Sequence, residues 1–226
     1  MNQRQWKKWK GAVKQLFLVG FILVSVLFII SWVGSQLANQ SLEQGINKEH
    51  LPALSEEIWE YKQLVEKYAK QHGMEEHVNT ILAMMMQESG GRGKDPMQSS
   101  ESLCGERGCI DDPEISIEQG VAFFAHAMER ADGDLKLAIQ SYNFGPGFIE
   151  YVRELKGEYS EDTAIAYSQK MYEEAGKDES IYSCLRAEAE ELEACYGDIY
   201  YVKSVMSYKE AIDMELERGE KRGGWL

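Results

Sequence analysis

Two carboxylates, Glu88 and Asp95, stand on either side of a glycine-rich turn, and they are the residues best suited to acid–base chemistry. Glu88 ends an apolar run with three consecutive methionines and directly precedes Ser89-Gly90-Gly91. The negative end of a helix dipole and apolar neighbours both favour the neutral form of a carboxyl group, as a general acid requires. Because two carboxyl groups in different environments are what glycosidic cleavage uses, the pair predicts that chemistry. The alternative is that Glu88 is a solvated helix end and Asp95 a turn residue before Pro96.

A third segment, Tyr142-Asn143, lies where an apolar helix is expected to meet Gly145. Taken alone, it is typical of a helix end with a core tyrosine. Other catalytic routes lack their motifs, since the sequence has no nucleotide-binding glycine loop, no zinc-binding HExxH and no GxSxG turn. The four histidines are scattered, and the sequence implies neither a metal nor an organic cofactor.

The elements that must position these residues are expected to be helices, which makes the fold class all-α. Helical spacing of apolar residues is predicted over 55–73, 75–89, 146–155, 161–175, 180–194 and 199–214. Ser116 with Gln119 forms a capping-box pattern that predicts the start of another helix, and Asp134 is expected to cap the next one. Residues 90–115 lack helical periodicity and are predicted to form a long ordered loop.

In combination, these segments resemble the lysozyme-like fold of the soluble lytic transglycosylases and goose-type lysozymes. That group has, in order, a catalytic Glu-Ser, a Gly-Leu-Met-Gln loop, an Ala-x-x-x-Tyr-Asn-x-Gly segment and a late Glu-Thr-x-x-Tyr-Val. Glu88-Ser89 matches the first of these, and Ala138 through Gly145 matches the third. Asp95-Pro96-Met97-Gln98 matches the second in part, and Gly197-Asp198-Ile199-Tyr200-Tyr201-Val202 keeps only the Tyr and Val of the fourth.

Where the sequence departs from this motif order, it resembles the CwlT-like lysozyme domain. That domain occurs in cell-wall hydrolases of Gram-positive bacteria and their conjugative elements. The segments that carry this resemblance are Glu88-Ser-Gly-Gly, Asp95-Pro-Met-Gln-Ser-Ser-Glu-Ser, Ser116-Ile-Glu-Gln-Gly-Val and Gln140-Ser-Tyr-Asn-Phe-Gly. The resemblance covers about residues 50–210. It implies peptidoglycan glycan strands as the substrate, and an envelope or conjugation machine as a partner.

The resemblance also implies a role for each matched residue. Glu88 becomes the general acid that protonates the glycosidic oxygen, and Asp95 a second catalytic carboxylate that stabilises an oxocarbenium-like state or positions water. Tyr201 is expected to contact the Glu88 carboxyl group, whereas Ser89 is equally a supporting residue or a plain helix end. The residues expected to bind substrate are Ser89, Gln98, Ser99, Ser100, Tyr142, Asn143 and Tyr201.

Two classes of function remain open at this point. The first is an active N-acetylmuramidase that cleaves the bond between N-acetylmuramic acid and N-acetylglucosamine. It would release either a reducing end, with water, or a 1,6-anhydro end, as a lytic transglycosylase does, and the Asp95 carboxylate favours hydrolysis. The second is a weakly active or inactive wall-binding scaffold of an envelope machine, against which the intact Glu88 argues.

The N-terminal segment has the pattern of a membrane anchor. Leu16–Val33 is an 18-residue run without charge, which at about 1.5 Å per residue nearly spans a bilayer core. Five basic residues precede the run, and no acidic residue occurs before Glu43. The positive-inside rule then predicts a cytoplasmic tail over 1–15, a single transmembrane signal anchor over 16–34 and an extracellular remainder. One alternative is a cleaved signal peptide, although the run is longer than such a segment needs. The other is a buried core helix, although the run is apolar all round and not along one stripe.

After the anchor, we expect a linker over 35–50, a lysozyme-like catalytic domain over 51–210 and a C-terminal tail over 211–226. The formal net charge of −14 argues against a nucleic-acid partner, because such proteins present a basic face to phosphates.

All four cysteines follow the anchor and none forms a CxxC pair, so an exported domain favours disulfides. Four cysteines allow three connectivities, and short loops favour Cys104–Cys109 and Cys184–Cys195; free thiols are the alternative in a chain that meets no oxidant. We expect the first disulfide to hold the Gln98-Ser99-Ser100 segment beside Glu88, and the second to lie far from the motifs and affect stability alone.

Overall fold

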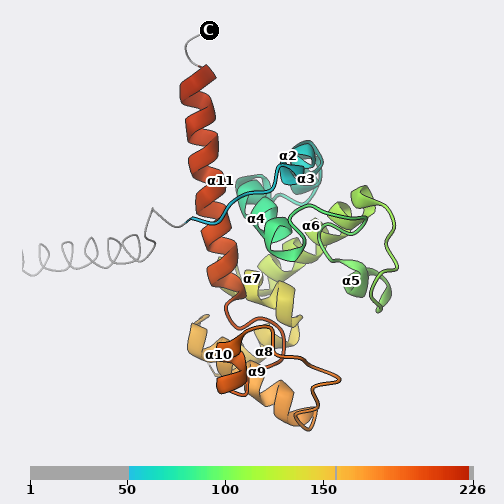
Figure 1. The fold of residues 1–226 in the computed structure, drawn as a ribbon, viewed down its shortest axis with the longest axis vertical. Coiled ribbons are helices and arrows are strands. Elements are labelled where there is room, and N and C mark those ends of the chain that lie inside the picture. Colours follow the sequence, from blue (N-terminus) through green and yellow to red (C-terminus); the bar gives the residue numbers. More distant parts are fainter. Residues whose placement is uncertain (1–50, 156, 224–226) are drawn as a thin grey trace, which may run out of the picture. The chain divides into compact units, whose positions relative to one another are not determined.

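The computed structural model describes residues 51–155 and 157–223, within the compact unit that begins at Leu51. Regular structure in these ranges is entirely helical, which confirms the all-α prediction (Figure 1). The elements are α2 (Glu57–Glu60), α3 (Lys62–Gln71), the 3₁₀ turn η2 (Glu75–His77), α4 (Val78–Glu88), α5 (Ser100–Cys104), α6 (Pro113–Arg130), α7 (Leu135–Phe144), α8 (Gly147–Glu154), α9 (Glu161–Glu174), α10 (Ala187–Glu191) and α11 (Tyr201–Gly223).

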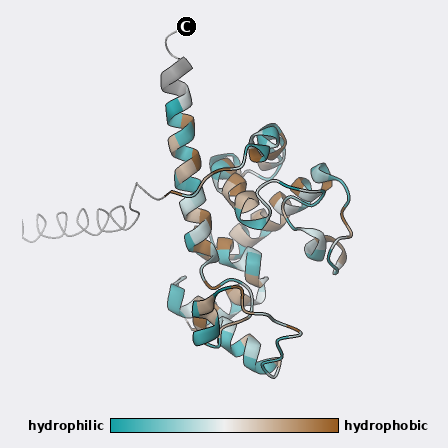
Figure 2. Cartoon of the chain, in the orientation of Figure 1, coloured by the Kyte–Doolittle hydropathy of each residue, from teal (hydrophilic) through white to brown (hydrophobic). Residues whose placement is uncertain are grey.

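The helix α4 forms the centre of the core. Seven consecutive residues, Thr80–Met86, are buried, so this helix is enclosed all round rather than along one stripe. The long helix α11 packs along α4, while α6 packs against α3 and α7 (Figure 1). Apolar residues are interspersed with polar ones along α11, as expected for a helix that buries one face (Figure 2). This packing brings the end of α4 next to the start of α11.

The helix α6 begins earlier than the sequence pattern predicted. Its N-cap is Asp112, whose side chain accepts a hydrogen bond from the Glu114 N–H at 2.9 Å, and Pro113 follows at the first helical position. Proline there has its fixed φ already suited to the helix, so Asp-Pro is the stronger start signal. The prediction that Ser116 caps this helix was therefore wrong, and Ser116 lies buried in the first turn.

The predicted cap of α7 is confirmed, because the Asp134 carboxylate accepts the N–H groups of Lys136 and Leu137, each at 3.0 Å. Three other features differ from the sequence-based expectations. The predicted loop 90–115 contains α5, and α10 occupies only part of the predicted helix 180–194. The last helix continues past residue 210, where the sequence placed the end of the domain, and Ala211 and Ile212 remain buried.

The predicted tail, anchor and linker, over 1–15, 16–34 and 35–50, lie outside the described residues. Within 51–155 and 157–223, no helix combines the length and the apolar character needed to cross a bilayer.

Candidate active site

Glu88 is the last residue of α4, and its half-buried side chain lines a cleft of about 510 Å³. Tyr201, at the start of α11 and 113 residues further along the chain, donates a hydrogen bond from its hydroxyl to Glu88 Oε1 at 2.5 Å. Burial is the strongest influence on this carboxyl group and raises the pKa of Glu88 to about 7. The Tyr201 hydrogen bond opposes the rise, and the charges of Asp95 and Asp198 add to it. Glu88 can therefore hold a proton near neutral pH.

Asp95 lies in the same cleft in the opposite electrostatic state. Its Oδ1 accepts hydrogen bonds from the Ser99 N–H at 2.9 Å and the Ser116 hydroxyl at 2.6 Å. Its Oδ2 accepts from the N–H and the hydroxyl of Ser100, at 3.1 and 2.6 Å. Burial alone would raise the pKa of Asp95, but these hydrogen bonds outweigh it and hold the pKa below its ordinary value. Asp95 is thus a charged carboxylate whose roughly four lone-pair positions are filled by the protein.

Residues 96–99 connect Asp95 to α5, and the fully buried Met97 holds this segment in place. The Met97 N–H donates to the Ser116 hydroxyl at 3.0 Å, and its carbonyl accepts the Tyr142 hydroxyl at 2.8 Å. The next residue, Gln98, has φ +48°, a left-handed conformation that is uncommon for a residue with a side chain. Gln98 is exposed and lines the cleft, so the pinned neighbours hold a strained residue at its edge.

Gly120 allows this segment to lie against α6. A Cβ at position 120 would stand 2.7 Å from the Met97 Cβ and 2.9 Å from the Tyr142 hydroxyl. Such contacts are shorter than carbon atoms tolerate, so any larger residue would push Met97 or Tyr142 away from the site. Gly120 belongs to the Ser116-Ile-Glu-Gln-Gly-Val segment that carries the family resemblance, and its contact with Met97 could not be read from that pattern.

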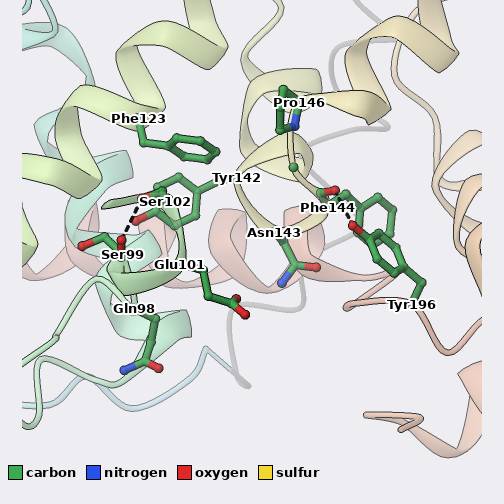
Figure 3. A pocket seen from close by; sticks show the side chains of 11 residues that line it. Gln98, Ser99, Glu101, Ser102, Phe123, Tyr142, Asn143, Phe144, Pro146 and Tyr196 are labelled. Carbon is green, nitrogen blue, oxygen red and sulfur yellow. Dashed lines mark hydrogen bonds between the residues drawn. The ribbon is translucent and has the colours of Figure 1, made fainter. Parts of the chain in front are cut away.

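A second cavity of about 300 Å³ adjoins the first and shares Gln98, Glu101, Tyr142, Asn143 and Tyr196 with it. Figure 3 shows this cavity, in which the Phe123 ring packs edge-on against Tyr142 with ring centroids 5.5 Å apart. The Asn143 Oδ1 accepts the Asp198 N–H at 2.8 Å, which leaves its amide nitrogen as the atom free to face a ligand. The two cavities together form an elongated cleft with Glu88 in one part and an aromatic wall in the other.

Both disulfides border this cleft, and the structure pairs Cys104 with Cys109 and Cys184 with Cys195. Arg107 and Gly108, inside the first disulfide loop, line the Glu88 cavity. Leu185 and Tyr196, each next to a cysteine of the second disulfide, line the same cavity. The expectation that Cys184–Cys195 lies far from the motifs was therefore wrong, because the chain folds its segment back over the cleft.

The structure brings together six of the residues predicted to form the site: Glu88, Asp95, Gln98, Tyr142, Asn143 and Tyr201. Three predicted substrate-binding serines have other contacts. Ser99 and Ser100 are buried, and their hydroxyl groups bind the Ser116 carbonyl and the Asp95 carboxylate respectively. The Ser89 hydroxyl donates to the Pro96 carbonyl at 2.8 Å and closes the turn that links the two carboxylates.

Comparison with known proteins places this geometry in a family. The model of the lysozyme-like family matches residues 55–209. The chain is 34% identical over 201 residues to the bifunctional muramidase/DL-endopeptidase CwlT of Bacillus subtilis, a match that covers 89% of this chain and 56% of CwlT. It is also 34% identical over 216 residues to the uncharacterized membrane protein YocA of the same organism, covering 93% of each.

Among solved structures, the chain resembles a Staphylococcus aureus protein described as similar to a lipoprotein of the NLP/P60 family. The TM-score is 0.60 at 35% sequence identity, and the match covers 70% of this chain and 54% of that one. The chain thus spans little more than half the length of CwlT and of the staphylococcal protein, but nearly the whole of YocA.

Proposed function

The chain belongs to the lysozyme-like family, in its CwlT-like branch, and on that premise we propose that it is a peptidoglycan glycosidase with Glu88 as general acid. The bond cleaved would be the one between N-acetylmuramic acid and N-acetylglucosamine, which makes the protein an N-acetylmuramidase. The similarity to a protein named as a muramidase supports this substrate class.

One observation carries the proposal: a half-buried carboxyl group with a pKa of about 7 lines an elongated cleft and is oriented by a tyrosine. A general acid works best when its pKa lies near the working pH, because it must both hold the proton and release it. A second carboxylate in the same cleft has its pKa held low, and such a divergent pair is typical of acid–base sites.

In the proposed reaction, the protonated Glu88 donates its proton to the glycosidic oxygen as the bond from that oxygen to the sugar carbon C1 breaks. The sugar left behind carries positive charge shared between C1 and the ring oxygen. The Glu88 carboxylate then accepts a proton from the group that attacks C1, so the acid is regenerated. Tyr201 steadies the carboxylate during this exchange through its hydroxyl group.

Asp95 contributes a fixed negative charge and holds the substrate-binding loop. Its oxygens are occupied by Ser99, Ser100 and Ser116, so it organises the segment that presents Gln98 to the cleft. Its charge also raises the pKa of Glu88 and favours the positive charge that develops on the sugar. Gln98, Tyr142 and Asn143 would line the sugar path.

The same contacts favour a second candidate reaction. A carboxylate with all its lone pairs filled is poorly placed to bind an attacking water or to bond with C1. If the 6-hydroxyl of the muramic acid attacks C1 instead, the product is a 1,6-anhydro sugar and the protein is a lytic transglycosylase. Glu88 is the general acid in both reactions.

We also propose that the catalytic domain acts on the wall side of the membrane, anchored by residues 16–34. The basic tail before an uncharged 18-residue run supports this orientation. The description of YocA as a membrane protein, with matched length, supports the membrane association.

The test uses the purified full-length protein, isolated peptidoglycan and the variants Glu88→Gln and Glu174→Gln. Glutamine keeps the shape of Glu88 but has no acidic proton, so lysis should fall by roughly 10²–10⁴-fold. Glu174 also ends a helix, α9, but it is exposed, paired with Lys170 and absent from the residues that line either cavity, so its variant should retain the wild-type kcat. Near-normal lysis by folded Glu88→Gln protein would remove the proposed function.

A further inference from the structure

Asp198, in the segment before α11, is a buried carboxylate whose polar groups all have partners. Its side chain is only 6% exposed, which is rare for a charged group unless it is paired. The guanidinium of Arg186 donates to both carboxylate oxygens at 2.7 Å in a two-pronged contact. The Tyr200 N–H donates at 2.9 Å and the Gln87 side chain at 3.3 Å to the same carboxylate.

The backbone of Asp198 reaches the candidate active site directly. Its N–H donates to the Asn143 Oδ1 at 2.8 Å, and its carbonyl accepts the Tyr201 N–H at 3.1 Å. The carbonyl also accepts the fully buried Gln140 side chain at 2.9 Å. Asp198 therefore fixes Tyr201, which binds Glu88, and Asn143, which lines the cleft. These contacts lie at the point where α4, α7 and α11 meet.

Arg186 joins the wall of the cleft to this junction. It lies between the two cysteines of the Cys184–Cys195 disulfide, next to Leu185, which lines the Glu88 cavity. Besides the two bonds to Asp198, its Nη2 donates to the Ser204 hydroxyl on α11 at 2.9 Å. The planar guanidinium is suited to such a fork, and a lysine could not reproduce it.

We propose that Asp198 and Arg186 form a positioning pair: their contact holds Tyr201 and Asn143 in place, and the charge of each offsets the effect of the other on Glu88. The inference rests on the proposed function, because Glu88 as general acid is its reference point. It also explains the departure from the Glu-Thr-x-x-Tyr-Val pattern, since Gly197-Asp198 supplies a carboxylate that is paired with Arg186.

The titratable groups that face Glu88 come from three directions: Tyr201 from α11, Tyr142 from α7, and Asp95 and Asp198 from the two loops. Of these, the charges of Asp95 and Asp198 raise the pKa of Glu88. Neutralising Asp198 should lower that pKa, and the unpaired Arg186 would lower it further. Neutralising Arg186 leaves Asp198 uncompensated, so the pKa of Glu88 should rise.

The experiment measures kcat for lysis of isolated peptidoglycan by the full-length protein across pH 5–9, with Asp198→Asn, Arg186→Gln and the double variant. We expect the pH at which activity is lost to move down in Asp198→Asn, up in Arg186→Gln and back toward wild type in the double variant. Looser placement of Tyr201 should also lower kcat in the single variants by roughly 10–100-fold. Arg186→Lys keeps the charge without the fork, so it should lower kcat at an unchanged midpoint.

The matched control is Glu193→Gln, which removes an acid from the same disulfide segment where it pairs with Lys177 at the surface. Its pH midpoint and kcat should equal those of wild type. If folded Asp198→Asn and Arg186→Gln share the wild-type midpoint, the pair is only structural and the inference fails. If Asp198→Asn does not fold, Arg186→Gln decides alone, since Arg186 is 34% exposed and lies outside the core. An inactive wild-type protein would instead refute the proposed function.

Discussion

At the scale of single residues, the position of Glu88 has a cost in stability that depends on pH. Its pKa is about 7 in the folded protein against an ordinary 4.5, so the folded state binds more protons between these values. Stability contributed by this residue therefore falls as pH rises from 4.5 to 7 and stays reduced above it.

Glu88→Gln should remove that cost. The gain in the free energy of unfolding should be about 2–3 kcal/mol at pH 8 and close to zero at pH 4, where the carboxyl is largely protonated in both states. Urea unfolding of both proteins at the two pH values measures the difference. An equal gain at pH 4 and pH 8 would show that the Glu88 carboxyl is not held protonated by the fold.

Replacing Gln98 by glycine tests whether this residue binds substrate or only shapes the backbone. A left-handed conformation costs a residue with a side chain roughly 1–2 kcal/mol, and glycine adopts it freely. Gln98→Gly should therefore unfold at the same or a higher temperature than wild type while its lysis rate falls, because the cleft loses a polar side chain.

The control for this variant is Asp132→Gly, at another residue with positive φ that is exposed and absent from the residues lining either cavity. It should gain stability without loss of lysis. If Gln98→Gly keeps full lysis, the Gln98 side chain takes no part in substrate binding, and only the backbone conformation at this position matters.

At the scale of elements, the Cys184–Cys195 disulfide is expected to serve activity as well as stability. Its loss frees a closed loop in the unfolded chain, which costs about 2–4 kcal/mol of stability. It should also release Leu185 from the cleft and Arg186 from Asp198 and Ser204. The Cys184→Ser/Cys195→Ser protein should therefore lyse peptidoglycan several-fold more slowly per folded molecule at a temperature well below its Tm.

The comparison is Cys104→Ser/Cys109→Ser, which opens the other disulfide loop beside the cleft. If the Cys184→Ser/Cys195→Ser protein lyses at the wild-type rate after correction for its folded fraction, the disulfide acts on stability alone.

Elements with strong local patterns were predictable, and those held by distant contacts were not. The sequence predicted α4, α7 and α9 to within a few residues because apolar periodicity and caps are local signals. The short helix α5 begins at Ser100, whose N–H and hydroxyl bind the Asp95 carboxylate. Its sequence has no helical periodicity, so this helix depends on that contact. The start of α6 was misplaced because the Ser116 pattern competed with Asp112-Pro113.

The candidate site shows the same division. Glu88 could be predicted because its apolar run and the glycines after it are contiguous in sequence. The donors around Asp95 include Ser116, which is 21 residues away in sequence. Arg186 binds Asp198, whose carbonyl in turn accepts hydrogen bonds from Gln140 on α7 and Tyr201 on α11. Such contacts depend on how helices pack, and a single sequence does not reveal them.

At the scale of the whole molecule, the charge distribution sets the expected topology. All 38 acidic residues lie at or after Glu43, and five basic residues precede the uncharged run. A protease added to intact, wall-stripped cells should therefore degrade residues 41–226 and spare the basic tail. Immunoblots against each end would measure this, and protection of the entire chain would rule out an exported wall enzyme.

The most direct test of the central claim, that Glu88 is the general acid of a muramidase, is mass spectrometry of the fragments released from peptidoglycan. Wild-type protein should release disaccharide units that end in N-acetylmuramic acid, as reducing sugars if water attacks and as 1,6-anhydro sugars if the 6-hydroxyl does. Folded Glu88→Gln protein should release neither. Fragments cut only in their peptides, or the same sugar products from Glu88→Gln, would contradict the account.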